Sequence, residues 1–144
     1  MIVVEPLIML TKGATTTVDV LRMQTSVTKC LGKLVDWESR LMVAANTDYN
    51  AIHLTPVQEL GSSNSNYSIS NHFKLDNRYG GGLVIDKLPP VIATLHKHFK
   101  CIITDVVLNH VSSDSPFLVE NPDIAYNLEN SPHLKPAWLV DRAI

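Results

Sequence analysis

The sequence predicts an α/β fold built around a parallel sheet, and three observations support this prediction. Short β-like runs alternate with helical patterns along the chain. A helical pattern at 36–46 is joined by a short link to a strand pattern at 51–55. Residues 101–108 form a near-continuous apolar run. Alternating helices and strands with short links are typical of βαβ units, and a strand without polar alternation is typical of one covered on both faces.

The N-terminal part has the least regular pattern. Residues 2–10 are apolar except at Glu5 and Pro6, which predicts a buried first strand with a bend or an end at the proline. Residues 15–20 are rich in β-branched side chains, and their structure stays open. Four apolar residues then recur at helical spacing and predict a helix that ends at Gly32: Met23, Val27, Cys30 and Leu31.

The middle of the chain is clearer. Asp36 is a candidate helix cap, and Asn46 a candidate helix end. The predicted apolar face of this helix consists of Trp37, Leu41, Ala44 and Ala45. Residues 51–55 predict a strand that Pro56 closes, and the polar residues 61–71 predict a loop.

Prolines and glycines mark the later elements. The run at 80–82 is all glycine and predicts a flexible point. Pro89 and Pro90 fit the first turn of a helix, where a missing N–H costs nothing. Residues 101–108 predict the next strand, and two further helices are predicted to start at Ser115–Pro116 and Lys135–Pro136.

Composition excludes several classes of function. The chain has 144 residues, of which 45% are hydrophobic and 18% charged, so it resembles a globular domain rather than a disordered one. Its net charge of −2 argues against a nucleic-acid or membrane-surface binder. There is no transmembrane-length apolar run, and the start lacks the basic residue of a signal peptide. Cys30 and Cys101 are far apart, so we expect buried, reduced thiols and a cytoplasmic location.

Candidate functional residues follow the predicted strand at 101–108. Ligands meet parallel α/β folds at the C-terminal ends of the strands. Asp105 lies inside the apolar run and needs a hydrogen-bonding partner, because a buried unpaired carboxylate costs several kcal/mol. Asn109 and His110 come where the strand is predicted to end. From residue type alone, Asp105 fits a structural role, and His110 fits a surface or core histidine as well as a functional one.

The segment Asp105-Val106-Val107-Leu108-Asn109-His110 resembles the first conserved region of the α-amylase superfamily of glycoside hydrolases. The stretches at 36–41 and 49–56 resemble the same family around its second barrel strand. Residues 125–128, and above all Asn130-Ser131-Pro132-His133-Leu134-Lys135-Pro136-Ala137-Trp138, resemble the glucanotransferase part of eukaryotic glycogen debranching enzymes. The resemblance covers nearly the whole chain, although residues 74–88 match poorly and Asp48 stands where the family usually carries glycine.

This resemblance implies a partial (β/α)₈ TIM barrel, open rather than closed, over residues 1–144. Residues 2–10, 49–55 and 101–108 would be its first three strands, out of a barrel that needs about 250 residues. It implies a glycogen-degrading enzyme with 4-α-glucanotransferase and amylo-α-1,6-glucosidase activities, acting on glycogen or maltooligosaccharide. The catalytic carboxylates would lie on strands beyond Ile144, so we expect no catalytic residue in this chain and no activity from it alone.

The resemblance also assigns roles to four residues. His110 matches a histidine that hydrogen-bonds the sugar, and Tyr67 matches a tyrosine that stacks beneath it; a turn tyrosine packed on the barrel rim is the alternative for Tyr67. Asp105 matches an aspartate that supports the site. Asn109 corresponds to a calcium ligand in many amylases, but with no acidic cluster nearby we expect a hydrogen-bonding role, no metal and no cofactor.

The other candidate sites are weaker, and one other class of function stays open. The side chains of His96 and His98 would point about 200° apart on a helix, so we expect both to be solvated rather than metal-binding. The glycines at 80–82 lack the spacing of a phosphate-binding loop. The alternative to an enzyme fragment is a non-catalytic α/β glucan-binding or interaction module, which the same tyrosine and histidine would serve.

Overall fold

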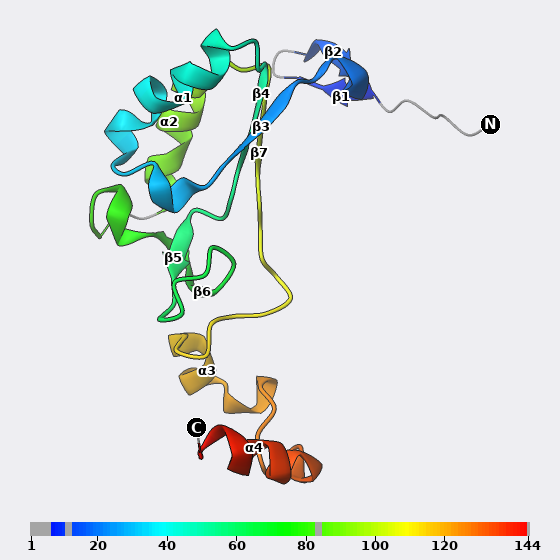
Figure 1. The fold of residues 1–144 in the computed structure, drawn as a ribbon, viewed down its shortest axis with the longest axis vertical. Coiled ribbons are helices and arrows are strands. Elements are labelled where there is room, and N and C mark those ends of the chain that lie inside the picture. The colour runs from blue at the N-terminus through cyan, green and yellow to red at the C-terminus, as the bar shows by residue number, and fades with distance from the viewer. Residues whose placement is uncertain (1–6, 11–12, 83–84, 144) are drawn as a thin grey trace, which may run out of the picture.

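The computed structural model describes residues 7–10, 13–82 and 85–143. At its centre is a three-stranded parallel sheet with the order β3 (Met23–Ser26), β4 (Ala51–Leu54) and β7 (Cys101–Thr104). Helix α1 (Trp37–Asn46) connects β3 to β4, and helix α2 (Leu88–Leu95) lies between β4 and β7 in the chain. Both helices cover the same side of the sheet (Figure 1). The predicted parallel α/β arrangement is therefore present, as an open sheet.

The prediction that the first strand is buried in the parallel sheet is wrong for the residues that the structure describes. Residues 2–6 lie outside the described part of the chain, and β1 (Leu7–Met9) pairs antiparallel with β2 (Thr15–Thr17) instead of joining the parallel sheet. The first strand of the parallel sheet is β3, where a helix was predicted. The apolar spacing there misleads because Met23, Val27 and Cys30 are exposed. Pairing with β4, over a separation of 28 residues, decides the structure of β3.

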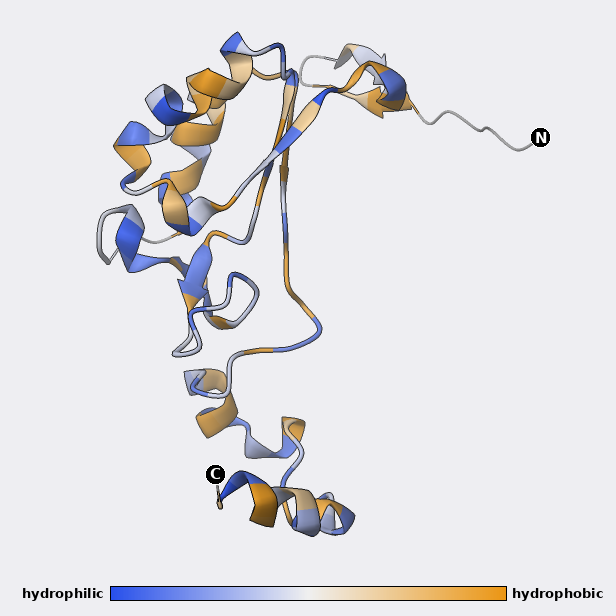
Figure 2. Ribbon diagram, in the orientation of Figure 1, coloured by the Kyte–Doolittle hydropathy of each residue, from blue (hydrophilic) through white to orange (hydrophobic). Residues whose placement is uncertain are grey.

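The hydrophobic core lies between the sheet and the two helices. The predicted face of α1 is confirmed, since Trp37, Leu41 and Ala44 are buried and meet Ile52 and Leu54 of β4 in one cluster. Figure 2 shows hydrophobic segments along both α1 and α2. Because successive residues of a strand point to opposite faces, a strand with Ile52 and Leu54 in this core turns His53 to the other face.

Trp37 is the centre of this core. Its side chain is fully buried, its ring meets that of Tyr79 edge to face at 5.1 Å between centroids, and its Nε1 donates to the Gly32 carbonyl oxygen at 3.0 Å. Gly32 has a φ of 68°, a conformation that glycine adopts without strain. Asp36 occupies the N-cap position as predicted, although its side chain makes no capping hydrogen bond.

The sheet face away from the helices is open. Strand β7 ends at Thr104, four residues before its predicted end, and Ile103 is exposed. The prediction that residues 101–108 are covered on both faces is therefore wrong. Thr25, His53 and Ile103 stand in register across this open face, one on each strand.

The segment between β4 and α2 holds more regular structure than its polar sequence predicts. Strands β5 (Gln58–Leu60) and β6 (Ile69–Leu75) pair antiparallel, with a bulged register, so the predicted loop shortens to residues 61–68. The three glycines at 80–82 all have positive φ, a backbone conformation that glycine adopts without strain. Asp48 also has a positive φ, 72°, at the position where the family usually carries glycine.

Two short helices follow the sheet. The predicted helix starts are confirmed: α3 (Pro116–Glu120) begins after Ser115, whose side chain accepts a hydrogen bond from the Phe117 N–H, and α4 (Lys135–Asp141) has Pro136 in its first turn. They extend from the C-terminal end of the sheet, beyond the β5–β6 hairpin (Figure 1).

Candidate functional site

The candidate site lies where the chain leaves the C-terminal ends of β4 and β7. Residues 105–115 run beside the β5–β6 hairpin and its loop. The Ser112 N–H donates to the Ile69 carbonyl oxygen at 2.8 Å, and the Ser62 N–H donates to Asp114 Oδ2 at 2.8 Å. These bonds bring together two loops that are about 45 residues apart in the sequence.

The structure brings all four of the predicted site residues together. Nε2 of His110 lies 3.1 Å from the Tyr67 carbonyl oxygen, and Nδ1 of His110 lies 3.0 Å from Asn109 Oδ1. Since a carbonyl oxygen only accepts, Nε2 of His110 carries the proton of its hydrogen bond. The Asp105 carboxylate lies near enough to the Tyr67 hydroxyl to raise the pKa of that hydroxyl. His110, Asn109 and Tyr67 are exposed, so their side chains face solvent at the rim.

Asp105 is the most constrained of the four. It lies directly after β7 rather than inside it, and its N–H donates to the Leu54 carbonyl oxygen at 3.1 Å. His53 Nε2 donates to its Oδ1 at 2.8 Å. This hydrogen bond, with a smaller contribution from the nearby Tyr67 hydroxyl, lowers the pKa of the Asp105 carboxyl below its ordinary value. Asp105 is therefore an ionised hydrogen-bond acceptor at neutral pH.

Tyr67 is an accessible residue at the rim of the site. Its exposed fraction is 45%. The nearby Asp105 carboxylate raises the pKa of the Tyr67 hydroxyl. The phenol is therefore protonated at neutral pH.

His53 and Thr25 also belong to the site, although neither was predicted from the sequence. Thr25 Oγ1 lies 3.1 Å from His53 Nδ1, so a hydrogen-bonded line runs from Thr25 through His53 to Asp105 across all three strands. The sequence did hold one signal for His53, because it is a polar residue at the third position of an otherwise apolar strand. Its partner could not be identified without the register that aligns β3, β4 and β7.

Two further expectations need correction. Cys30 is exposed and Cys101 only partly buried, so neither is the buried thiol that was expected, although both are free. His96 is exposed as predicted, but His98 Nε2 bonds Glu38 Oε1 at 2.8 Å and is not simply solvated. The turn after α2 folds back against α1 and brings this pair together.

Clustered metal ligands and long apolar helices are both absent from the described part of the chain. Within residues 7–10, 13–82 and 85–143, no three His, Cys, Asp or Glu side chains form a group that could hold a metal ion. Over the same ranges, no helix has the length and apolarity to cross a membrane.

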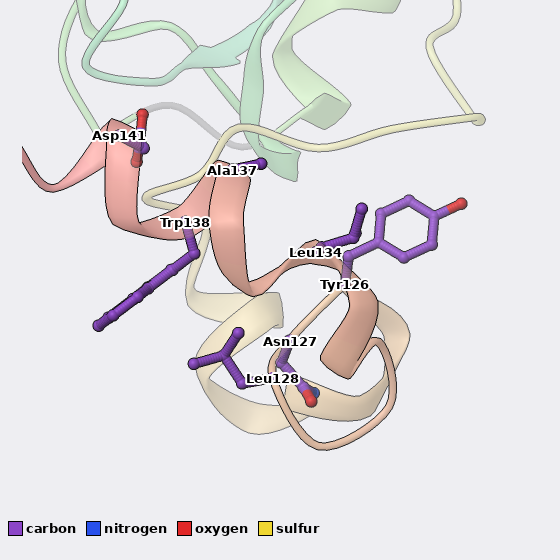
Figure 3. A pocket seen from close by; sticks show the side chains of 7 residues that line it. All are labelled: Tyr126, Asn127, Leu128, Leu134, Ala137, Trp138 and Asp141. Carbon is purple, nitrogen blue, oxygen red and sulfur yellow. The ribbon is translucent and has the colours of Figure 1, made fainter.

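The motif at 130–138 forms one wall of a hollow of about 520 Å³ between α4 and the preceding turns. It is lined by Tyr126, Asn127, Leu128, Leu134, Ala137, Trp138 and Asp141. The rings of Tyr126 and Trp138 project from different sides of the hollow instead of facing each other (Figure 3). The Arg142 guanidinium lies 5.4 Å from the centre of the Trp138 ring. The aromatic side chains here do not form a clamp.

Gly61 controls how the two loops of the candidate site meet. It is buried, and a Cβ there would overlap the Ser112 side chain and press on Asp114 Oδ1. We expect Gly61→Ala to lower the free energy of unfolding by about 1–3 kcal/mol, measured by chemical denaturation, because the loops must separate. Adding Ser112→Gly, which removes the nearest obstructing atoms, is expected to restore part of the loss. Equal stability of wild type and Gly61→Ala would contradict the packing described.

Comparison with known proteins gives a consistent result. The family model described as "Glycogen debranching enzyme, glucanotransferase domain" matches residues 14–144. The glycogen debranching enzyme of Saccharomyces cerevisiae is 36% identical over 123 residues, which are 85% of this chain and 8% of that enzyme. The chain thus spans a small part of the length of this curated relative.

Solved structures show the fold. An α-amylase from Lactobacillus plantarum matches with a TM-score of 0.61 and 18% identity, over 75% of this chain and 27% of that one. A maltogenic α-amylase from Thermotoga neapolitana matches with a TM-score of 0.63 and 17% identity, over 76% and 28%. The structural neighbours are therefore α-amylase barrels, and part of this chain shares their fold.

Proposed function

The chain belongs to the family of the glucanotransferase domain of glycogen debranching enzymes, and from this premise we propose that it supplies the sugar-binding side of a 4-α-glucanotransferase site. The parent activity would be the transfer of α-1,4-glucan segments and the removal of α-1,6-linked glucose in glycogen breakdown. The observation that supports this best is the 3.1 Å contact between His110 Nε2 and the Tyr67 carbonyl, which joins the loops after two neighbouring strands.

We propose that β3, β4 and β7 are the first three strands of a (β/α)₈ barrel. The helices cover one face of the sheet, while Met23 and Ile103 stay exposed on the other face, as expected for the inner wall of a barrel that other strands complete. The α-amylase neighbours support the same arrangement. The domain would then be the N-terminal part of the catalytic barrel.

Each site residue has a distinct proposed role. The exposed ring of Tyr67 would stack on the apolar face of a pyranose, since a flat ring suits that surface. His110 would exchange its bond to the Tyr67 carbonyl for a bond to a sugar hydroxyl, with Asn109 lying beside its other nitrogen. Asp105 would support the site as an ionised acceptor held by His53. None of these roles needs a metal or cofactor.

The reaction itself needs groups that these residues do not provide. Retaining glycosidases and transferases use a carboxylate nucleophile and a carboxylic acid about 5 Å apart. Asp105 is ionised and held by His53, so it is neither a proton donor nor a free nucleophile. We therefore propose that the 1–144 polypeptide by itself binds glucan without transferring or hydrolysing it.

Calorimetric titration with maltoheptaose tests the binding proposal. We expect millimolar binding by the 1–144 polypeptide, and a loss of about tenfold in Tyr67→Ala, since an aromatic stacking contact contributes about 1 kcal/mol beyond the area it buries. Tyr126→Ala is the matched control, because Tyr126 is an exposed tyrosine on the C-terminal segment, and it should leave the affinity unchanged. No heat at millimolar sugar, or equal losses in both variants, would refute the binding role.

An activity assay tests the second half of the proposal. The purified 1–144 polypeptide should neither disproportionate maltooligosaccharides nor release glucose from a limit dextrin. Activity that survives removal of contaminating enzyme and disappears in Asp105→Asn would contradict it. The alternative, a glucan-binding module unrelated to catalysis, predicts the same null result. It is distinguished by whether residues 14–144 sustain transfer when they replace the matched segment of the yeast enzyme.

A further inference from the structure

We propose that Asn64 is a positioning residue for this site, because it fixes the loop at 61–68 that carries Tyr67. Its hold on the loop comes from two hydrogen bonds, one donated by Lys29 and one by Arg78. The importance of Tyr67 for glucan rests on the function proposed above, but the fixing of the loop does not. Asn64 would act on the sugar only through the position of Tyr67.

Loop 61–68 consists of two consecutive turns that meet at Asn64. The Asn64 N–H donates to the Gly61 carbonyl oxygen at 2.9 Å in the first turn, and the Ser68 N–H donates to the Ser65 carbonyl oxygen at 3.2 Å in the second. The Gly61 N–H closes the neck of the loop by donating to the Ser68 carbonyl oxygen at 2.8 Å. Asn64 has a φ of 56°, a left-handed conformation that asparagine adopts more readily than most residues. The direction of the second turn relative to the first is therefore set at Asn64.

Two cationic side chains hold this junction from outside the loop. Lys29 Nζ donates to the Asn64 carbonyl oxygen at 2.8 Å, and the Arg78 guanidinium donates to Asn64 Oδ1 at 2.6 Å. Hydrogen bonds with a charged donor are stronger than those between neutral groups. One bond holds the backbone and the other holds the side chain of the same residue, so Asn64 cannot turn without losing at least one of them.

Lys29 stands on a segment that is fixed to the central sheet. It lies in the short helical turn that follows β3, next to Thr28, which is buried. The Thr28 N–H donates to Thr55 Oγ1 at 3.0 Å, and Thr28 Oγ1 donates to the Pro56 carbonyl oxygen at 2.8 Å. Because Thr55 and Pro56 directly follow β4, the backbone of Lys29 has a fixed place at the C-terminal end of this strand.

Arg78 is fixed to the hydrophobic core. It directly precedes Tyr79, whose buried ring packs on that of Trp37. Arg78 Nε also lies 3.6 Å from Oδ1 of Asp76, a buried carboxylate that favours a cationic neighbour. The bond from Arg78 to Asn64 thus ties the loop to the core that also holds the central sheet.

The other side of the loop meets the site. The Tyr67 carbonyl oxygen accepts a hydrogen bond from His110 Nε2 at 3.1 Å. Tyr67 comes three residues after Asn64 and is exposed, so packing restrains its ring little and the loop backbone decides where the ring lies. Without Asn64 Oδ1 the junction loses one of its two external bonds, and we expect the turn that carries Tyr67 to become mobile.

Two substitutions separate the hydrogen bonds of Asn64 from its backbone conformation. Asn64→Asp retains an acceptor for Arg78 and tolerates a positive φ, whereas Asn64→Gly adopts this φ with the least strain but has no side-chain acceptor. If the residue matters only for its conformation, Asn64→Gly should behave like wild type. If it positions the loop, only Asn64→Asp should do so.

The measurement is NMR relaxation of the backbone amides of residues 65–67 in the 1–144 polypeptide. Rigid backbone gives order parameters of about 0.85, and flexible backbone gives values below about 0.6. We expect rigid values in wild type and Asn64→Asp, and flexible values in Asn64→Gly. Arg78→Met should loosen the same residues with asparagine still in place, which separates the lost bond from the flexibility of glycine itself. Lys29→Met, which leaves Asp76 paired with Arg78, should also loosen them.

Maltoheptaose affinity gives the second readout. Asn64→Gly and Arg78→Met should each weaken binding about fivefold, the factor that one net hydrogen bond contributes, and the double variant should lose no more than either alone. Asn64→Asp should bind like wild type. The matched control is Asp48→Gly, because Asp48 also has a positive φ and contacts an arginine, Arg22, but lies before β4 rather than after it. Asp48→Gly should change neither the affinity nor the loop.

The outcomes distinguish this inference from the proposed function. Equal order parameters in wild type, Asn64→Asp and Asn64→Gly, or a loop that stays rigid in both Arg78→Met and Lys29→Met, would overturn the inference. A mobile loop with unchanged glucan affinity in Asn64→Gly, or an equal loss of affinity in Asp48→Gly, would overturn it as well. The expected relaxation pattern without any glucan binding would instead support the fixing of the loop and refute the proposed function.

Discussion

Trp37→Ala is expected to lower the free energy of unfolding by about 3–5 kcal/mol, a larger loss of stability than Gly61→Ala should cause. The side chain is fully buried between α1 and the turn that carries Tyr79, so its removal leaves a cavity that the neighbouring helices cannot close. It also leaves the Gly32 carbonyl oxygen without its donor. Chemical denaturation followed by far-UV circular dichroism measures the loss.

The matched control for this substitution is Trp138→Ala. Trp138 lies on α4, is 43% exposed, and contacts Arg142 on the surface. An exposed cation–π pair contributes about 0.5–1 kcal/mol, so the control should lose much less stability than Trp37→Ala. Equal losses for the two tryptophans would show that the α1–sheet interface is not the main core.

His110→Ala is expected to reduce turnover by roughly 10²-fold in a debranching enzyme that carries this segment, while the fold stays intact. The appropriate protein is the yeast enzyme with its matched segment replaced by residues 14–144. His110 is exposed and lies beyond the packed strands, so truncation costs little stability. What is lost is a hydrogen bond to the sugar that tightens at the oxocarbenium-like transition state.

His96→Ala is the control for that measurement. His96 is an exposed histidine that directly follows α2, a helix packed on the face of the sheet opposite to His53. The His96→Ala substitution should leave kcat and KM unchanged. If the His110→Ala chimera had the same turnover as the unmodified chimera, His110 would not belong to the site, even if glucan binding persists.

The elements that the sequence predicts well are those decided locally. Helix α1 follows from the spacing of Trp37, Leu41 and Ala44, and helices α2 and α3 begin where prolines fit a first turn. Strand β3 was missed because its residues also fit a helical stripe, and only pairing with β4 distinguishes the two. The β5–β6 hairpin was missed because its polar residues are stabilised by the distant segment around Ser112.

The residues of the candidate site divide in the same way, into those that the sequence identifies and those that it does not. Tyr67, Asp105, Asn109 and His110 could be selected from motifs, because each stands in a run of residues that resembles the α-amylase superfamily. His53 could not, because an isolated histidine in an apolar strand has no partner until the register is known. The line of hydrogen bonds through Thr25, His53 and Asp105 depends on three strands that the sequence places about 28 and 50 residues apart.

The central claim is that the loops after β4 and β7 together form the surface that contacts glucan. The most direct test is the change in backbone amide NMR signals of the protein when maltoheptaose is added. The account predicts changes concentrated in residues 61–68 and 105–112, with the tip of α4 unaffected. Changes confined to the hollow around Trp138, or spread evenly over the chain, would contradict it.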